Sequence, residues 1–185
     1  IYAASSSCYG SPKKIPTKEN DKIDVKHPYA FTKLLGEETV IKYANFFGMP
    51  NISCRFFNVY GPRLNTKGQY GAVFGNFLTQ KRNNKPLTIV GNGNQTRDFI
   101  HVEDLIDAFM KLIRSDLRNK IYNLGSGKET SINQIARIIG GEKIFIPKRP
   151  NEPSRSCANI LKIKKDISWK PKISINEGVK KLFGN

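Results

Sequence analysis

Two apolar segments joined by a helix occupy the first 57 residues and limit the possible folds most strongly. Residues 1–5 and 51–57 are short apolar runs, typical of buried strands. Between them, residues 28–47 begin with Pro28, which suits a first helical position, and stop at Gly48. Strands joined through a helix pair in parallel, because the crossover returns the chain to the end where it began. The sequence therefore predicts an α/β fold with a parallel sheet.

The rest of the chain continues this alternation of strands and helices. Between positions 11 and 28 the residues are polar and include three prolines, which indicates a loop. Later apolar runs predict strands, and segments with helical periodicity predict helices. The expected strands are 87–90, 96–102, 120–124 and 142–147, and the expected helices are 72–84, 103–115, 132–139 and two short ones after residue 158.

Tyr29 and Lys33 stand four residues apart on the first predicted helix, so both side chains lie on one face, a turn apart. A tyrosine has a pKa of about 10 in water, and a neighbouring cation favours its phenolate. This pair can therefore supply a general base near neutral pH. Since the chain is rich in lysine, the same spacing also fits chance, with Tyr29 an aromatic residue that packs on the core.

Three serines, Ser5, Ser6 and Ser7, follow directly after the first apolar run and precede a Tyr-Gly turn. Open parallel sheets place their chemistry just past the carboxyl ends of the strands. Hydroxyl groups at that point are candidates for substrate contacts. A plain turn at the end of a strand is the alternative.

Charge indicates which partners to expect. The chain has 31 Lys and Arg against 15 Asp and Glu, a formal net charge of +16. The lysines are dispersed and are not interleaved with aromatic residues as in nucleic-acid-binding motifs, so we expect them to face solvent. A basic module that binds nucleic acid or another polyanion is the competing hypothesis.

Cysteine and histidine usage bears on redox setting and metals. Cys8, Cys54 and Cys157 show no Cys-x-x-Cys spacing and are odd in number, and His27 and His101 cannot complete a metal centre. No apolar run is long enough to span a membrane. We therefore expect no disulfide, no metal, no membrane association and a cytoplasmic location.

Seven short motifs occur in an order typical of one enzyme family. They are SSSCYG, PYAFTK, RFFNVYGPR, TRDFIHVEDL, YNLGSG, RPNE and WKP, and together they extend over essentially the whole chain. The arrangement resembles the NAD-dependent epimerase/dehydratase family of the extended short-chain dehydrogenase/reductase superfamily, especially UDP-glucose 4-epimerases. No Gly-x-Gly-x-x-Gly turn for a dinucleotide follows a strand, so the resemblance implies the C-terminal part of a longer enzyme.

The resemblance also implies a domain organisation. The fold would comprise the C-terminal part of a Rossmann-like parallel sheet and a small α/β substrate-binding region. Residues 1–62 would belong to the NAD-binding domain and residues 63–185 mainly to the substrate-binding region, with residues 97–124 returning to the Rossmann-like domain. The cofactor would be NAD and the substrate a nucleotide sugar linked to UDP. The full-length enzyme would be a homodimer that uses the helix carrying Tyr29.

By the same resemblance, Tyr29 is the active-site base, Lys33 bonds the nicotinamide ribose and lowers the pKa of the tyrosine, and Ser5 bonds the reacting sugar oxygen. Phe56 contributes to the cofactor site. Oxidation of a sugar hydroxyl needs a base for its proton, an acceptor for its hydride and a donor that polarises the ketone. NAD would stay bound and return the hydride to the other face of the sugar.

Three further residues match family contacts to the substrate's phosphates or sugar. Asn58 matches an asparagine that contacts phosphate or sugar, and Arg97 and Arg149 match arginines that clamp the diphosphate. A planar guanidinium group bonds phosphate oxygens in pairs, which suits this role.

Positions that contact the nucleoside complete the comparison. Thr88 and Val90 correspond to residues that line the base, and Glu152 to an acid that binds the ribose. The chain departs from the family at Glu152, because RPNE replaces Arg-Pro-Gly-Asp, and at Asn159, where an alanine-aspartate pair is usual.

The serines indicate which reaction to expect. Sugar dehydratases have an acidic pair where this chain has Ser6 and Ser7, and elimination of water needs those acids. The resemblance therefore favours a UDP-hexose 4-epimerase, acting on UDP-glucose or UDP-N-acetylglucosamine. A dehydratase, decarboxylase or reductase of the same family is the alternative. Without its dinucleotide-binding half, the chain by itself is expected to be inactive.

Other polar residues need only structural roles. We expect Arg55 as a solvated cation at a strand end and His101 as a hydrogen-bonded core residue. Asp98 and Asp104 are expected to brace loops or cap helices.

Overall fold

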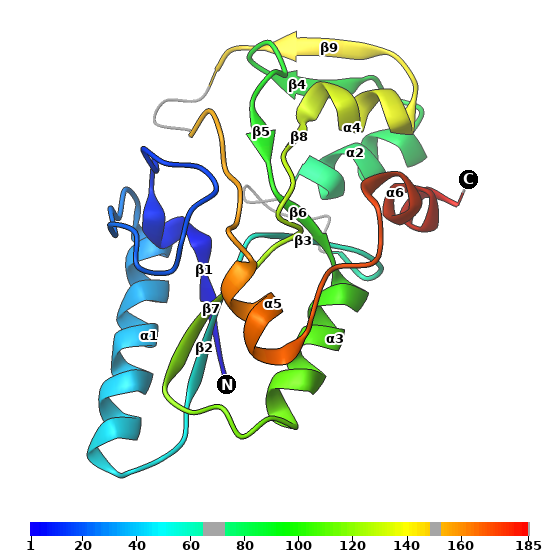
Figure 1. Ribbon diagram of the computed structural model, residues 1–185. Helices are drawn as coiled ribbons and strands as arrows, with labels where there is room; N and C mark the ends of the chain where they lie inside the picture. The colour runs from blue at the N-terminus through cyan, green and yellow to red at the C-terminus, as the bar shows by residue number, and fades with distance from the viewer. Residues whose placement is uncertain (65–72, 149–152, 185) are drawn as a thin grey trace.

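A three-stranded parallel sheet forms the centre of the molecule (Figure 1). The computed structural model describes residues 1–64, 73–148 and 153–184. The strand order is β1-β2-β7, with both neighbouring pairs parallel. The strands are β1 (Tyr2–Ser5), β2 (Ile52–Phe56) and β7 (Lys120–Leu124). The predicted parallel strand-helix-strand unit is confirmed.

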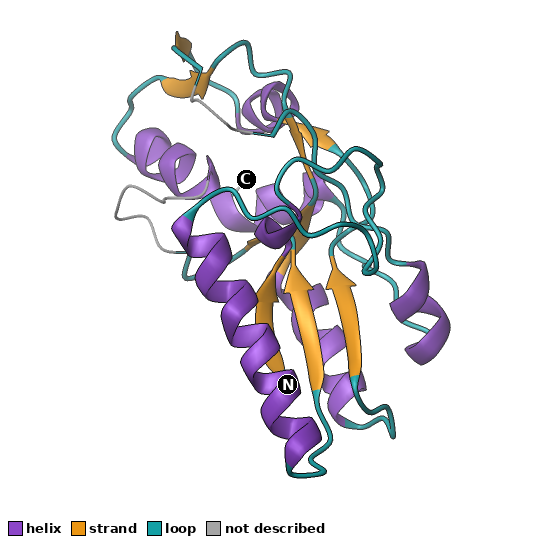
Figure 2. Cartoon of the chain, turned by 90° about the vertical axis from the view of Figure 1, so that its left-hand side faces the viewer, coloured by secondary structure: helices purple, strands orange, loops and turns teal. Residues whose placement is uncertain are grey.

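Helices cover both faces of this sheet. α1 (Pro28–Phe46) lies on one face and α3 (Val102–Ile113) on the other, as Figure 2 shows with α1 in front. Gly36 in the middle of α1 permits a close approach to β1, because a Cβ atom there would lie 2.0 Å from the hydroxyl of Tyr2. The helix that carries Tyr29 is therefore seated directly on β1.

Smaller sheets and helices lie beyond the C-terminal ends of the central strands. β3 pairs with β6 and β4 with β9, both in parallel, and β5 pairs with β8 in the antiparallel sense. The strands are β3 (Asn58–Tyr60), β4 (Leu87–Val90), β5 (Thr96–Arg97), β6 (Phe99–His101), β8 (Thr130–Ser131) and β9 (Lys143–Ile146). The helices there are α2 (Val73–Arg82), α4 (Ile132–Ile139) and α6 (Ile175–Phe183). α5 (Leu161–Ile167) instead lies beside β7, where Lys162 Nζ donates to the carbonyl oxygen of Ile121.

The strand expected at 96–102 is divided in two at Asp98. The buried carboxylate of Asp98 accepts hydrogen bonds from the backbone N–H groups of Ser126, Gly127 and Ala158 at 2.6, 2.9 and 2.9 Å. Burial raises the pKa of Asp98 above its ordinary value, although these bonds favour the carboxylate. The expectation that Asp98 braces loops is confirmed.

β2 presents different residues to its two neighbouring helices, because alternate side chains of a strand point to opposite faces. Ile52 and Cys54 belong to the hydrophobic cluster that also contains residues of α3. Ser53 and Arg55 point toward α1 and bond Glu37. The expectation that Arg55 is a solvated cation is wrong, because it is only 4 % exposed and forms an ion pair with Glu37.

His101 and Asp104 have the structural roles expected of them. His101 is buried, and its Nδ1 accepts a hydrogen bond from the backbone N–H of Glu103 at 3.3 Å, which caps α3. Asp104 accepts hydrogen bonds from the backbone N–H groups of Lys172 and Ile173 and so ties the C-terminal segment to α3.

The three cysteines are buried free thiols. Among residues 1–64, 73–148 and 153–184, no three His, Cys, Asp or Glu side chains are grouped so that they could hold a metal ion. In the same ranges no helix combines the length and the apolar character needed to cross a membrane.

Candidate active site

A pocket of about 380 Å³ lies where β1 and β2 end. Ser5 is the last residue of β1, Phe56 is the last residue of β2, and Tyr29 comes from the first turn of α1. Asn58 in β3 and Arg97 in β5 close the pocket from the side of the smaller sheets. The structure thus brings five of the predicted site residues around one cavity.

Ser5 is oriented by the turn that follows it. The turn is the short 3-10 helix η1 (Ser6–Tyr9), and Ser5 is its N-cap. The Ser5 hydroxyl oxygen accepts hydrogen bonds from the backbone N–H and from the hydroxyl of Ser7, at 3.2 and 2.8 Å. Because this oxygen already accepts two hydrogen bonds, its own proton is the part left to bond a ligand. Ser5 is therefore suited to donate a hydrogen bond into the pocket.

Tyr29 is held at the start of α1 by a cap on the preceding turn. The Nδ1 of His27 accepts a hydrogen bond from the backbone N–H of Ala30 at 3.3 Å, and Pro28 occupies the first turn. The rings of His27 and Tyr29 are nearly parallel, with an interplanar angle of 10° and centroids 6.1 Å apart. His27 also lines the pocket. Sequence analysis gave His27 no role, although a polar residue directly before a helical Pro is an N-cap signal.

Lys33 lies one turn further along α1 and contacts β1. Its ammonium group donates a hydrogen bond to the carbonyl oxygen of Ala3 at 3.0 Å and lies 5.8 Å from the ring centroid of Tyr2. One N–H bond of the ammonium thus fixes the side chain to the edge strand. An ammonium carries three donors, so this bond leaves two of them unused. Lys33 is not among the described residues that line the pocket with Tyr29.

Asn58 and Arg97 give the opposite wall of the pocket its polar groups. The backbone N–H and the side-chain Nδ2 of Asn58 both donate to the carbonyl oxygen of Asp98, each at 3.0 Å. Arg97 donates from its guanidinium group to the carbonyl of the preceding residue at 2.8 Å. Lys26 lines the same pocket and is paired with Asp24 at 2.9 Å. No carboxylate is found among the described residues of the lining.

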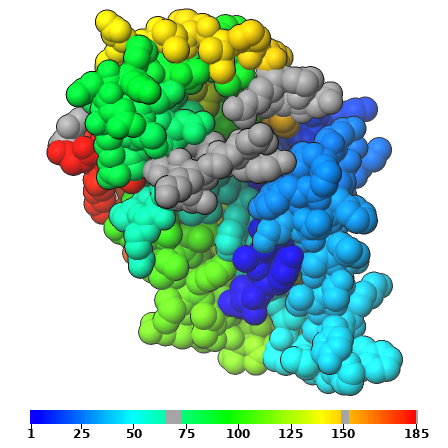
Figure 3. Space-filling view, turned by 180° about the vertical axis from the view of Figure 1, so that it is seen from behind, coloured from blue at the N-terminus to red at the C-terminus, as the bar shows by residue number. Residues whose placement is uncertain are grey.

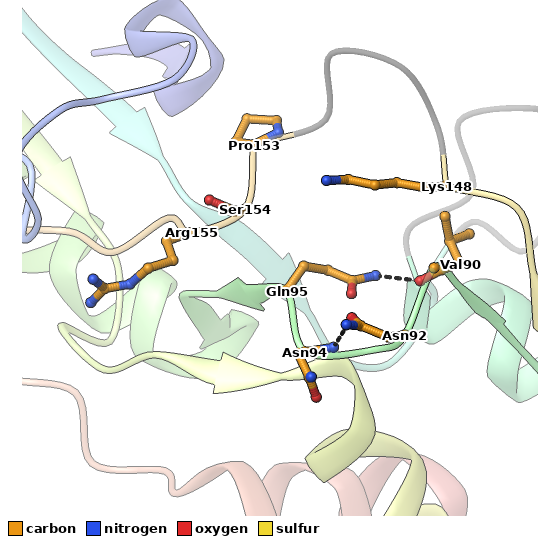
Figure 4. Close-up of a pocket in the computed structure, with 9 residues that line it drawn as sticks. Val90, Asn92, Asn94, Gln95, Lys148, Pro153, Ser154 and Arg155 are labelled. Atoms are coloured by element: carbon orange, nitrogen blue, oxygen red, sulfur yellow. Dashed lines mark hydrogen bonds between the residues drawn. The ribbon is translucent and has the colours of Figure 1, made fainter.

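A second pocket of about 440 Å³ adjoins the first (Figure 4). Pro153 lines both cavities, so they lie side by side along the segment that begins there. The second pocket is rich in amide side chains, including Asn92, Asn94 and Gln95. The Nε2 of Gln95 donates to the carbonyl oxygen of Val90 at 2.9 Å, which fixes the amide against the end of β4.

The two residues predicted to line the nucleoside base differ in position. Val90 lines the second pocket, whereas Thr88 is not among its described lining residues. The hydroxyl oxygen of Thr88 accepts a hydrogen bond from the Nε2 of Gln80 at 2.7 Å, and the backbone N–H of Thr88 donates to Gln80 Oε1 at 3.1 Å. Thr88 thus joins β4 to α2. The amide residues that do line the pocket were missed, although the turn GNGNQ after an apolar strand was visible.

Arg149 and Glu152 lie outside the described residues. Their predicted contacts to diphosphate and ribose remain predictions.

The model of the NAD dependent epimerase/dehydratase family matches residues 1–125 of the chain. The chain belongs to this family. The match includes the serines of η1 and both Tyr29 and Lys33, so the resemblance inferred from the motifs is confirmed.

Several named relatives of the chain are UDP-sugar 4-epimerases. The chain is 31% identical to the UDP-glucose 4-epimerase of Mycolicibacterium smegmatis over 97% of its own length and 59% of the relative's. A solved UDP-N-acetylglucosamine 4-epimerase of Methanobrevibacter ruminantium is 28% identical, with a TM-score of 0.92 over 100% of this chain and 61% of that one. The UDP-glucuronic acid 4-epimerase of Bacillus cereus, solved with UDP-glucuronic acid and NAD, is 29% identical, with a TM-score of 0.90 over 98% and 59% of the two chains.

The epimerase/dehydratase chain described here therefore spans about three fifths of the length of these relatives. Over that span its fold is theirs, which confirms the predicted α/β class with part of a Rossmann-like parallel sheet.

Proposed function

We propose that this chain is the catalytic and substrate-binding part of an NAD-dependent 4-epimerase that acts on a UDP-linked hexose. The observation that carries the proposal is the meeting of Ser5 and Tyr29, from separate elements, at one pocket. A hydrogen-bond donor and a base on one cavity are what reversible oxidation of a sugar hydroxyl requires. The relatives described above are UDP-sugar 4-epimerases, which supports the same assignment.

In this proposal Tyr29 takes the proton of the sugar's C4 hydroxyl. Ser5 donates a hydrogen bond to the same oxygen and stabilises the ketone as it forms. Lys33 supports Tyr29 from the next turn of the helix and keeps two donors for a ribose. The keto sugar then rotates in the pocket to present its other face, and return of the proton from Tyr29 completes the epimerisation.

NAD, when bound, would supply a reversible acceptor for the C4 hydride of the sugar. Three residues of the chain suit such a group: Tyr29, Lys33 and Phe56. Tyr29 and Phe56 line the pocket. The ammonium group of Lys33 bonds the carbonyl oxygen of Ala3 in β1 and has two further N–H donors. A ribose diol fits such an ammonium, because it offers oxygens to a multiple donor.

The UDP moiety would extend from the first pocket into the second. The sugar would lie against Ser5 and Tyr29, and the diphosphate would pass Arg97 near Pro153, where the two pockets meet. The base would lie beside Val90, within reach of the amide of Gln95. A uracil edge presents both acceptors and a donor, which a carboxamide complements. Arg149 and Glu152 would complete this path on the residues not described.

Epimerisation is favoured over dehydration by the make-up of the first pocket. Water elimination needs an acid, and Ser6 and Ser7 stand where dehydratases have one. The described part of the lining contains no carboxylate. The sugar is therefore expected to leave with its hydroxyl groups intact and one centre inverted.

We further propose the domain division at residue 62, a cytoplasmic location and a homodimer. The free thiols fit a reducing compartment. Supporting the dimer, α1 exposes large apolar side chains. The surface of this helix lies at the right of the molecule in Figure 3, in blue to cyan. The exposed side chains include Phe31, Leu35, Tyr43 and Phe46, each more than half exposed. Apolar surface of this kind commonly marks an interface.

The test uses the full-length gene product with NAD. UDP-glucose, UDP-N-acetylglucosamine and UDP-glucuronic acid are each incubated with the enzyme, and the C4 epimers are followed by NMR. We expect one of these sugars to interconvert and the Tyr29→Phe variant to be slower by about a hundredfold or more. A keto-deoxy product or a pentose in place of a C4 epimer would overturn the epimerase assignment.

A further inference from the structure

A buried ion pair joins α1 to the central sheet. Glu37 of α1 is 1 % exposed and Arg55 of β2 is 4 % exposed. Arg55 Nε lies 3.2 and 3.1 Å from the two carboxylate oxygens of Glu37, and Arg55 NH2 lies 2.6 Å from Oε1. The hydroxyl of Ser53 donates to the same carboxylate at 2.7 Å. Both oxygens of Glu37 are therefore held by donors from β2.

The ion pair lies on the catalytic face of the helix. Tyr29, Lys33 and Glu37 follow one another at intervals of four residues, so their side chains leave α1 on one side at successive turns. Lys33 bonds β1 and Glu37 bonds β2. A slide or rotation of α1 that moved Tyr29 would have to break the bonds made by Glu37.

The same guanidinium group also holds the turn that carries the serines. Arg55 NH1 donates to the hydroxyl oxygen of Tyr9 at 2.9 Å, and the Tyr9 hydroxyl donates to Asn123 Oδ1 of β7 at 2.8 Å. Tyr9 is the last residue of η1, whose N-cap is Ser5. One buried side chain thus bonds the helix of Tyr29 on one side and the turn of Ser5 on the other.

Stability alone does not account for such a pair. Taking two charges out of water costs about as much as their attraction returns, and well-packed apolar residues often replace a buried pair without loss. Hydrogen bonds differ from apolar contacts in being directional, because they weaken steeply when the angle or the distance changes. The pair between Glu37 and Arg55 therefore restricts the position of α1 in a way that apolar side chains would not.

We propose that Arg55, with Glu37 and Tyr9, is a positioning device that sets the separation of Tyr29 from Ser5. None of the three is among the described residues that line the 380 Å³ pocket, so they act through Tyr29 and Ser5, which do line it. The expected effect of these residues on kcat rests on the proposed function. Small displacements of reacting groups are costly, since a misplacement of about 1 Å can lower a rate about a hundredfold.

The decisive variant replaces the pair by apolar residues of similar size, Glu37→Leu with Arg55→Met, in the full-length enzyme. We expect each single change to lower the melting temperature and the double variant to recover most of it. The kcat of the double variant is expected to stay about 10- to 100-fold below wild type, with KM changed less than about threefold. Recovery of kcat together with the melting temperature would overturn the proposal.

A gentler variant and a matched control accompany it. Tyr9→Phe removes only the hydroxyl that links Arg55 to η1, and we expect kcat to fall several-fold while the protein stays folded. The control replaces an exposed ion pair between α6 and α3, Lys181→Met with Glu103→Leu, and should leave kcat unchanged. An unchanged kcat in Tyr9→Phe would overturn the proposal, because Arg55 would then not act on the turn that carries Ser5.

Hydrogen exchange tests the positioning without substrate. In the Glu37→Leu/Arg55→Met variant, the amides of Ala30 and Ser7 should exchange about tenfold faster or more, whereas the amides of α6 keep their rates. Unchanged exchange at Ala30 and Ser7 would overturn the proposal. A wild-type enzyme that formed no C4 epimer would overturn only the proposed function, because the exchange measurement does not depend on turnover.

Discussion

The two faces of the central sheet are built from different chemistry. Toward α3, β2 presents Ile52 and Cys54 to an apolar cluster. Toward α1, the same strand presents Ser53 and Arg55 to the carboxylate of Glu37. One strand of five residues therefore stabilises one helix by apolar burial and holds the other by directed hydrogen bonds.

The difference follows the division of labour between the helices. α1 carries Tyr29 and Lys33, whereas no residue of α3 is among the described residues that line the 380 Å³ pocket. Apolar contacts are non-directional, so they fill space without fixing the position of an element. Under the proposed function, the polar face lies against the helix that carries the proposed base, and the apolar face against a helix with no proposed catalytic residue.

The largest expected effect comes from breaking the polar face on one side only. Arg55→Met leaves the Glu37 carboxylate buried without its partner, and such a change typically costs about 3–5 kcal/mol. We expect the free energy of unfolding, measured by urea titration, to fall by this amount. A decrease in the free energy of unfolding of less than about 1 kcal/mol would show that water solvates the Glu37 carboxylate in this variant.

The apolar face should respond differently to a comparable loss. Leu112 of α3 is 1 % exposed in the apolar cluster between α3 and the central sheet. Leu112→Ala should lower the free energy of unfolding by about 2–5 kcal/mol, because apolar contact is lost and a cavity forms. At a temperature where the variant is folded, we expect kcat to equal that of wild type. A kcat that fell with stability would erase the distinction between the faces.

Much of this architecture is readable from the sequence, because periodicity and turn residues are local signals. The pattern of residues 1–57 predicts the parallel unit, and Ser5 and Tyr29 do meet at one pocket. The interruption at Asp98 was not foreseen, since it depends on backbone donors at residues 126, 127 and 158 that are distant in the chain.

The role of Arg55 could not be predicted for a related reason. A lone arginine near a strand end resembles a solvated cation, and its partner Glu37 lies 18 residues earlier on a helix. The helix pattern alone does not reveal that this glutamate faces the sheet. Thr88 shows a different limit. The apolar run predicts its strand correctly, but it does not reveal that the Thr88 hydroxyl accepts a hydrogen bond from Gln80.

The pKa is raised at two neighbouring residues of β2, which keeps Cys54 neutral and Arg55 charged. Burial among apolar side chains raises the pKa of Cys54 from 9.0 to about 12. For Arg55, burial disfavours the charge, but the hydrogen bonds with Glu37 outweigh it and the pKa rises, so the charged form is kept. A thiol whose pKa is raised contributes stability that is fully present below pH 9.0 and is lost as the pH rises toward 12.

We therefore expect the free energy of unfolding to fall above pH 9.0, by up to about 1.4 kcal/mol per pH unit from this thiol. Urea titrations at a series of alkaline pH values measure the slope, and Cys54→Ala should make it shallower. Burial also raises the pKa of Tyr9, Tyr60 and Tyr122, so their ionisation lowers the free energy of unfolding at alkaline pH as well. The comparison is therefore between the slope for wild type and the slope for Cys54→Ala. Parallel slopes would show that Cys54 is not shielded from solvent.

The smallest expected effect concerns the cap of α1, which adds a second directed contact beside the polar face. His27→Ala removes the acceptor of the Ala30 amide and should cost about 1 kcal/mol, whereas His27→Asn keeps an acceptor at the N-cap. Since Tyr29 lies in the first turn, fraying there should lower kcat more than the loss in stability suggests. Amide exchange at Ala30 and kcat, measured for both variants, separate the two contributions. If alanine and asparagine behave alike, the ion pair at Glu37 alone is sufficient to hold the turn that carries Tyr29.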